Sequence, residues 1–247
     1  MNAKQRAKQY LRQILRGVGL DVMAYSVMRS HELRRAALLR DLGIGLVVDG
    51  GAHMGEYAGS LRRLGYARRI LSLEPLPGPF AQLQALAARD PHWQCVNVAL
   101  GEAPGQSTFL ENPISQVSSL LPATGRVNTR GWQGTKPLTV EMCTIDGLLE
   151  KQSWDGRLYI KLDVQGYEMQ ALAGAAQALR KAAAIELELS TVELYRGSVL
   201  FSDAVWQLHQ LGYSLFSSEP ALVDYQSARM LQVDCIFVRD EPAGSSA

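Results

Sequence analysis

The sequence predicts an α/β fold of the doubly wound, Rossmann-like class, with helices on both faces of a mainly parallel sheet. Short apolar runs typical of buried strands alternate with helical patterns along most of the chain. Two of these strands end in an acidic residue, Asp49 and Glu74, and each acid is followed by a turn and a helical pattern. Ligands of such sheets bind at the carboxyl ends of the strands, so the two acids predict a cofactor site there.

The composition is typical of a globular protein with one large domain and an appendage. Of the 247 residues, 47% are hydrophobic and 20% are charged, and the net charge of +1 gives no general indication of nucleic-acid binding. No apolar run is as long as a membrane span, and the first residues lack the apolar core of a signal peptide. The cysteines lack C-x-x-C spacing, which predicts buried free thiols at Cys95, Cys143 and Cys235. We therefore expect a cytoplasmic protein with no nucleic acid as a partner.

The N-terminal part predicts a helical extension over residues 1–42, before a main domain over residues 43–240 and a flexible tail over residues 241–247. Residues 1–20 contain no acid and predict a basic amphipathic helix, and a second helix is expected over residues 21–41. The basic residues are Lys4, Arg6, Lys8, Arg12 and Arg16, and the apolar stripe is Leu11, Ile14, Leu15 and Val18. The simplest interpretation is a docking helix with a solvated basic face. Contact with substrate or with an anionic membrane surface is the alternative.

The turn after the first strand carries the clearest cofactor motif. Gly51 allows a sharp turn, and Gly55 lets the following helix approach the strand closely. The spacing is not the dinucleotide pattern G-x-G-x-x-G. The carboxylate of Asp49 would repel a pyrophosphate but suits a cationic amine, such as the one in S-adenosylmethionine (SAM).

The next two strands supply the expected nucleoside contacts. The strand over residues 69–74 ends in Glu74, where a carboxylate binds the ribose hydroxyls in doubly wound folds. The alternative role for Glu74 is to cap the helix expected over residues 78–88. A third strand is expected over residues 93–100, and its end, from Asn97 to Leu100, should approach the adenine ring.

The middle of the chain predicts an extra strand over residues 106–111 and a short strand over residues 140–143, with Thr144 capping the turn that follows. Between them, residues 112–137 are rich in Ser, Thr, Gly, Pro and Asn and show no periodicity. Loops of this length are often functional lids, and disorder is the alternative.

A second motif follows the strand that begins at Leu158. Alternation places Lys161 and Asp163 on one face at the strand's carboxyl end, where Asp163 is positioned for chemistry. A plain buried ion pair is the alternative for these two residues. On the next strand, over residues 184–189, Glu186 and Glu188 share a face. A helix over 199–211 and an antiparallel hairpin built from 213–216 and 233–238 complete the expected fold.

With these motifs, the chain resembles the FkbM family of SAM-dependent methyltransferases from about residue 46 to residue 239. The most specific stretch is Lys161-Leu162-Asp163-Val164-Gln165-Gly166-Tyr167-Glu168. The shorter matching motifs are the turn from Asp49 to Tyr57, Leu73-Glu74-Pro75, Ala99-Leu100-Gly101, Thr144-Ile145-Asp146 and Val233-Asp234-Cys235-Ile236-Phe237-Val238. The resemblance implies a seven-stranded SAM-binding sheet with a reversed final hairpin.

The chain departs from the family pattern at three positions. It has Gly50 where the family usually has an aliphatic residue, His53 where the family has asparagine, and Gln165 where the family has glutamate. His53 could still donate hydrogen bonds near the methionine moiety and could titrate near neutral pH. Gln165 removes a carboxylate, which disfavours this position as a base or a metal ligand.

These motifs and the resemblance together predict transfer of a methyl group from SAM to a hydroxyl, on a sugar of a glycan, a glycolipid or a small natural product. An attacking hydroxyl needs a base, for which Asp163 is the first choice and His53 the second, with Lys161 orienting Asp163. Glu188 is expected to bind the acceptor and Tyr167 to wall the site. The expected cofactor contacts are Asp49, Gly51, Ala52, His53, Gly55, Tyr57, Glu74, Pro75, Asn97, Ala99, Leu100 and Asp163.

Three alternatives remain open. Asp146, Asp163 and Glu188 could hold a divalent ion, although no compact ligand spacing supports this and no metal is expected. A nicotinamide-dependent oxidoreductase would also place acids at Asp49 and Glu74, but the third glycine of its motif is missing. A binding protein without catalytic activity would have no need of these acids. The oligomeric state is not predicted.

Overall fold

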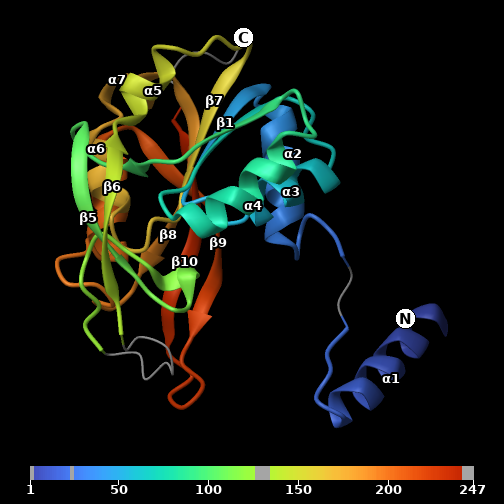
Figure 1. Cartoon of the computed structure of the whole chain (residues 1–247). Coiled ribbons are helices and arrows are strands. Elements are labelled where there is room, and N and C mark those ends of the chain that lie inside the picture. Colours follow the sequence, from blue (N-terminus) through green and yellow to red (C-terminus); the bar gives the residue numbers. More distant parts are fainter. Residues whose placement is uncertain (1–2, 23–24, 126–133, 241–247) are drawn as a thin grey trace.

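The computed structural model describes residues 3–22, 25–125 and 134–240. The expected tail over residues 241–247 and the centre of the loop expected over residues 112–137 lie outside the described residues. The described part forms a large sheet flanked by helices, with a smaller sheet beside it (Figure 1).

The large sheet has seven strands in the order β3-β2-β1-β7-β8-β10-β9. Neighbouring strands from β3 to β8 run parallel, whereas β10 runs antiparallel to both β8 and β9. The strands are β1 (Ile44–Gly50), β2 (Arg69–Leu73), β3 (Trp93–Val96), β7 (Arg157–Leu162), β8 (Ala182–Ser190), β9 (Tyr213–Val223) and β10 (Met230–Arg239). This topology confirms the expected doubly wound, seven-stranded sheet with a C-terminal antiparallel hairpin.

Helices cover both faces of this sheet because apolar side chains alternate along its central strands. On β1, Val47 belongs to the core formed with α2, α3 and α4, and Val48 belongs to the core formed with α5 to α8. Figure 1 shows α2, α3 and α4 together on one side of the sheet. The helices are α1 (Ala3–Gly17), α2 (His31–Asp41), α3 (Glu56–Arg63), α4 (Pro77–Ala87), α5 (Ile145–Leu149), α6 (Glu168–Ala173), α7 (Ala176–Lys181) and α8 (Phe201–Gln210).

The strand expected over residues 93–100 is wrong in its second half. The chain leaves the large sheet at Asn97, whose side-chain amide donates hydrogen bonds to the backbone oxygens of Glu74 and Pro75. The segment after Asn97 then joins a smaller sheet, in the order β4-β6-β5. Its strands are β4 (Ala99–Leu100), β5 (Gly105–Glu111) and β6 (Lys136–Cys143). The extra strand is thus confirmed as β5, and the short strand expected before Thr144 begins earlier than predicted.

One expected helix is shorter than predicted. The helix expected over residues 21–41 begins only at His31, where the Ser30 side chain accepts a backbone hydrogen bond from the first turn of α2. After β7 the chain forms two short helices, α6 and α7, with Gly174 between them, where a Cβ would lie 2.1 Å from the backbone oxygen of Gly101. The predicted cap of α5 by Thr144 is confirmed.

Candidate functional site

Two adjoining cavities lie at the carboxyl edge of the large sheet. We call the first the apolar cavity. It is lined by Leu73, Glu74, Pro75, Leu76, Val98, Ala99, Leu100, Phe109, Ser115, Ser118, Leu120, Val164 and Gln165. We call the second the acidic cavity. It is lined by Arg35, Ala52, Glu56, Tyr57, Lys161, Leu162, Glu186, Glu188 and Asp234. Both cavities are also lined by Gly51, His53, Gln116 and Asp163, so these residues form the junction between them.

The turn after β1 brings the backbone to this junction. Gly51 has a positive φ of 71°, and a Cβ there would lie 1.8 Å from the backbone oxygen of Asp163, so only glycine fits. The N–H groups of Gly51 and Ala52 both donate to the oxygen of Leu73, at 3.0 Å. Gly55 packs against the ring of Trp93 and lines neither cavity, so its expected close-packing role holds without a ligand contact.

Glu74 lines the apolar cavity at the end of β2, although only 5% of its surface is exposed. Its two carboxylate oxygens accept hydrogen bonds from the backbone N–H groups of His53, at 2.9 Å, and Leu76, at 2.8 Å. Burial raises the pKa of Glu74, and these two hydrogen bonds oppose the rise. Each oxygen keeps a further lone pair, so the carboxylate can both brace the turn and accept a ribose hydroxyl.

Asp49 is placed differently from its expected role. Its side chain is fully buried and lines neither cavity, so direct contact with a ligand amine is not available. The indole N–H of Trp93 donates to Ser72, the Ser72 hydroxyl donates to Asp49, and the Asp49 carboxylate lies 3.4 Å from the Nζ of Lys161. Asp49 therefore acts on the cavities through Lys161.

Asn97 and Tyr57 also differ from expectation. The Asn97 amide holds the turn after β2, as described above, and Asn97 lines neither cavity, which gives no support to the expected contact with a purine. Tyr57 lines the acidic cavity rather than the apolar one and donates its hydroxyl to Glu186 at 2.6 Å. Of the other expected cofactor residues, Pro75, Ala99 and Leu100 line the apolar cavity, and Ala52 lines the acidic one.

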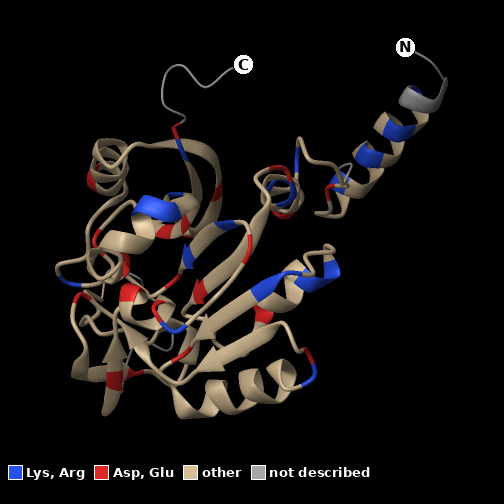
Figure 2. Cartoon of the chain, turned by 90° about the horizontal axis from the view of Figure 1, so that it is seen from above, with Lys and Arg blue, Asp and Glu red and all other residues tan. Residues whose placement is uncertain are grey.

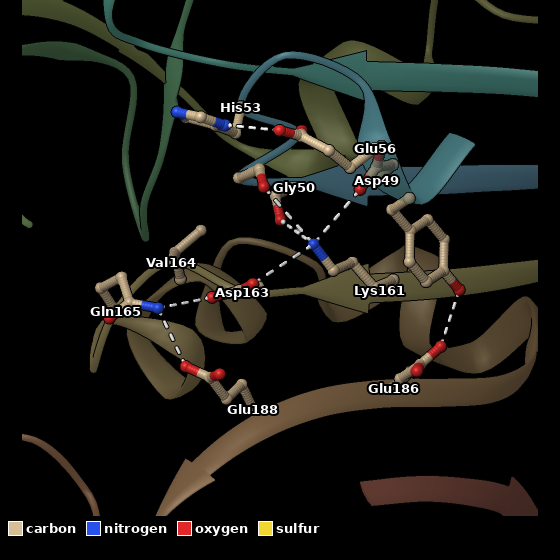
Figure 3. Close-up of polar contacts among 12 residues, drawn as sticks. Asp49, Gly50, His53, Glu56, Lys161, Asp163, Val164, Gln165, Glu186 and Glu188 are labelled. Atoms are coloured by element: carbon tan, nitrogen blue, oxygen red, sulfur yellow. Dashed lines mark hydrogen bonds and ion pairs between the residues drawn. The ribbon is translucent and has the colours of Figure 1, made fainter. Parts of the chain in front are cut away.

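Lys161 is a cation of the acidic cavity that lies between Asp49 and the junction residue Asp163 (Figure 3). Its Nζ lies 3.4 Å from Asp49 and 3.8 Å from Asp163, and 3.5 Å and 3.4 Å from the backbone oxygens of Gly50 and Gly51. Burial alone would lower the pKa of Lys161, but the charges of Asp49, Asp163 and a third carboxylate raise it overall. Lys161 therefore stays protonated and cannot serve as a base near neutral pH.

Asp163 follows β7 and is held from the other side by Gln165. The Nε2 of Gln165 donates to Asp163 at 2.7 Å and to Glu188 at 2.9 Å, as Figure 3 shows. The hydroxyl of Tyr195 donates to the oxygen of the same amide at 2.6 Å, and Gln165 has a positive φ of 54°. A glutamate could not donate these two hydrogen bonds, so the amide at this position couples the two carboxylates. In the sequence, Gln165 is recognisable only as a departure from the family pattern, and no motif indicates Tyr195.

Among the acids that line the acidic cavity, Glu186 has a cationic partner in Arg35, whereas Glu188 and Asp234 form no ion pair with a described residue. Glu186 accepts hydrogen bonds from the Arg35 guanidinium, and also from the hydroxyls of Tyr57 and Tyr159. Burial would raise the pKa of Glu186, but Arg35 lowers it overall. Burial and neighbouring acids raise the pKa of Asp234 to about 7 and that of Glu188 well above its ordinary value.

Arg35 was missed in the sequence, although a signal existed. It lies on the buried face of α2 together with His31, Leu38 and Leu39, at helical spacing. A cation among apolar positions indicates a buried carboxylate partner, which is Glu186 on β8.

Of the remaining expected residues, His53 lies at the junction of the two cavities, whereas Tyr167 and Asp146 line neither. His53 bridges the junction, with its ring nitrogens 3.0 Å from Glu56 and 2.8 Å from the Ser115 hydroxyl. Tyr167 lines neither cavity, so it gives no wall to the site. Asp146 accepts two backbone N–H bonds at the start of α7, which separates it from Asp163 and Glu188 and removes the alternative metal set. Within the described ranges, no cluster of three or more His, Cys, Asp or Glu residues could hold a metal ion.

Comparisons with known proteins find one family model and several similar structures. Residues 49–215 match the family model described as the methyltransferase FkbM domain. No curated protein sequence shows significant similarity to the chain. Among solved structures, precorrin-6y C5,15-methyltransferase from Geobacter metallireducens is 14% identical, with a TM-score of 0.44 over 89% of this chain and 94% of that one.

Two further structures are similar at the same level. One is 1,6-didemethyltoxoflavin-N1-methyltransferase from Burkholderia thailandensis, solved with S-adenosylhomocysteine, at 12% identity and a TM-score of 0.43 over 98% of this chain and 92% of that one. The other is the N-methyltransferase NodS from Bradyrhizobium japonicum, at 11% identity and a TM-score of 0.45 over 87% and 100%. The family match spans more than half of the chain, and on this basis the chain belongs to the FkbM family and is a SAM-dependent methyltransferase.

Proposed function

We propose that this methyltransferase transfers the methyl group to a hydroxyl oxygen of a sugar or a similar polyol bound in the acidic cavity. The observation that supports the proposal is the position of Asp163, at the junction of a cavity suited to the cofactor and a second cavity rich in carboxylates. A carboxylate between the two ligands can accept the proton that the attacking hydroxyl loses.

The residues that line the apolar cavity suit the chemical groups of SAM. The side chains of Val98, Leu100 and Phe109 offer apolar walls for a purine, and Glu74 offers free lone pairs for the ribose hydroxyls. The absence of a side chain at Gly51 lets the backbone approach the ligand. When bound, SAM supplies a methyl group that the sulfonium already activates, so the protein needs chiefly to align the acceptor and exclude water.

Asp163 is the proposed general base. Lys161 and Gln165 hold its two oxygens from opposite sides, through contacts of 3.8 Å and 2.7 Å, and so fix the direction in which the carboxylate faces the acceptor. His53 is the alternative base, but both of its ring nitrogens have partners, Glu56 and Ser115.

The acidic cavity suits a polyol because carboxylates and buried carboxylic acids can accept or donate hydrogen bonds to several hydroxyls at once. Glu56, Glu188 and Asp234 line it beside Asp163. The same excess of acids over free cations also suits an amine acceptor, since a cationic amine would be stabilised there. Transfer to nitrogen is therefore the second candidate function.

The test is product identification with SAM that carries a deuterated methyl group. The protein is incubated separately with sugars and sugar glycosides, phenols, amines and RNA, and the position of the label is determined by mass spectrometry and NMR. We expect label on a sugar oxygen. Asp163→Asn should lower kcat by about 10²–10⁴-fold while leaving SAM affinity unchanged. Label on nitrogen or on RNA would contradict the proposal, and unchanged turnover in the variant would exclude Asp163 as the base.

A further inference from the structure

Exposed apolar side chains are concentrated at the N-terminus. Of the eighteen large hydrophobic side chains that are exposed in the described residues, nine lie between residues 10 and 28. In α1, Leu11 is 55% exposed, Ile14 is 53% exposed and Tyr10 is still more exposed. The spacing of three residues places Leu11 and Ile14 on one stripe of the helix, and the exposed Val18 lies in the turn that directly follows α1. This stripe is not covered by the rest of the described chain.

The other side of α1 is cationic. Arg6, Lys8, Arg12 and Arg16 carry positive charge, and the first acid in the chain is Asp21. Asp21 pairs with Arg12 and Arg16, but these three side chains stay accessible to solvent, with 31% to 57% of each exposed. Figure 2 shows the positions of Lys and Arg residues, in blue, spaced along the ribbon of α1 with no acidic residue between them.

The position of α1 leaves both sides accessible. In Figures 1 and 2, α1 lies apart from the sheets and is joined to α2 by a connecting segment. The described part of that segment, residues 18–22 and 25–30, contains no helix or strand. No helix in the described part of the chain is both long and apolar enough to cross a membrane. An isolated helix of this length is marginal in water, so a surface that covers its stripe would also stabilise it.

We propose that α1 docks the protein on the surface of an anionic phospholipid membrane, lying in the plane of the interface. The apolar stripe of α1, formed by Leu11 and Ile14, enters the boundary between headgroups and acyl chains together with Val18 after the helix, and the cations contact the lipid phosphates. RNA would attract the same cations but would leave the apolar stripe exposed. A second copy of the chain could cover the stripe, but it would bring the cations of two helices together.

The test measures vesicle binding by the full chain. Vesicles of phosphatidylcholine mixed with phosphatidylserine are compared with vesicles of phosphatidylcholine alone, by flotation and by fluorescence titration. We expect binding to the mixed vesicles that salt weakens. Arg6→Gln with Lys8→Gln should weaken it by about 25-fold, at about fivefold for each cation. Leu11→Ser with Ile14→Ser should weaken it by at least about tenfold.

Matched controls distinguish α1 from the rest of the surface. Arg180→Gln with Lys181→Gln removes two exposed cations from α7, and Trp206→Ser removes an apolar side chain from α8 that is 64% exposed. Both controls should bind vesicles as the parent does. The proposal is overturned if the parent binds neither type of vesicle, or if the α1 variants bind as the parent does. It is also overturned if the parent binds RNA in preference to vesicles, or if Leu11→Ser with Ile14→Ser dissociates a dimer.

Discussion

Replacing Arg35 by methionine measures how much the ion pair between α2 and Glu186 contributes to the stability of the protein. Arg35 is only 7% exposed and makes three hydrogen bonds of 2.6–3.0 Å to the buried Glu186. Methionine fills much of the same space but brings neither charge nor donors. The substitution therefore leaves Glu186 as a buried carboxylate that keeps only its bonds from the hydroxyls of Tyr57 and Tyr159.

The expected loss of stability in Arg35→Met follows from leaving the buried charge of Glu186 without a cationic partner. Removing one partner of a buried ion pair costs about 3–5 kcal/mol, out of a total stability of about 5–15 kcal/mol for a typical domain. Arg40→Met is the matched control, because Arg40 lies on the same helix and pairs with Asp41 while 74% exposed. An exposed pair contributes at most about 1 kcal/mol. Urea unfolding of the three proteins, followed by circular dichroism, measures both differences.

The pH dependence supplies an independent check of the cause. In the parent protein, Arg35 holds the pKa of Glu186 below its ordinary value of 4.5. This contribution to stability is present above pH 4.5 and is lost as the pH falls through the lowered pKa. In Arg35→Met, burial without a cation raises the pKa of Glu186, so the variant regains stability as the pH falls toward 4.5. The free-energy gap between variant and parent should therefore be largest near pH 7–8 and should narrow in acid.

Adding Glu186→Gln to Arg35→Met should recover part of the loss at neutral pH, because the amide oxygen still accepts from the two tyrosines without a charge. For the double variant, the difference in unfolding free energy from Arg35→Met should also shrink as the pH falls, because the double variant has no carboxyl at position 186 to take up a proton. An Arg35→Met penalty no larger than that of Arg40→Met would refute the reasoning. So would a penalty that is the same at every pH.

Three further predictions concern the cavities. Glu74→Gln should weaken S-adenosylhomocysteine binding by about tenfold or more, because a charged acceptor for the ribose is lost; isothermal titration measures it, and unchanged affinity would remove Glu74 from the cofactor site. Gly51→Ala should abolish cofactor binding or folding, since its Cβ would lie 1.8 Å from a backbone oxygen, whereas Gly78→Ala, with no atom within 4 Å of its Cβ, should leave the same titration unchanged. Gln165→Leu removes the N–H donor that holds Asp163, so kcat should fall by about tenfold while S-adenosylhomocysteine affinity stays the same; an unchanged kcat would contradict the positioning of the base by Gln165.

The seven-stranded sheet could be predicted because its signals are local. Each buried strand carries its own apolar run, and the acids Glu74 and Asp163 follow β2 and β7 directly. Those positions alone place both residues at one edge of a parallel sheet. The caps of α2 and α5 are equally local signals. The apolar residues before Ser30, however, extend the helical pattern back to residue 21 and so hide the cap at Ser30.

The distribution of residues between the two cavities could not be predicted, because it depends on contacts between distant segments. Asp49 is hidden beneath Lys161, which comes from a strand more than a hundred residues later. Arg35 and Glu186 are 151 positions apart. Asn97 turns the chain out of the large sheet because it finds acceptors at the end of another strand. The helical spacing shows that Arg35 is buried, but no period or spacing in the sequence identifies the distant partner in any of these pairs.

The buried contact of α2 with the sheet also bears on how the N-terminus of this protein can vary during evolution. The helix α2 is joined to the lining of the acidic cavity by the ion pair between Arg35 and Glu186. A change in the length or orientation of α2 would therefore disturb this cavity. α1 has no comparable anchor, and the segment between the two helices contains no regular structure in its described residues. Related enzymes could therefore exchange or lose α1 freely while α2 is retained, and a new surface attachment could arise without altering the reaction.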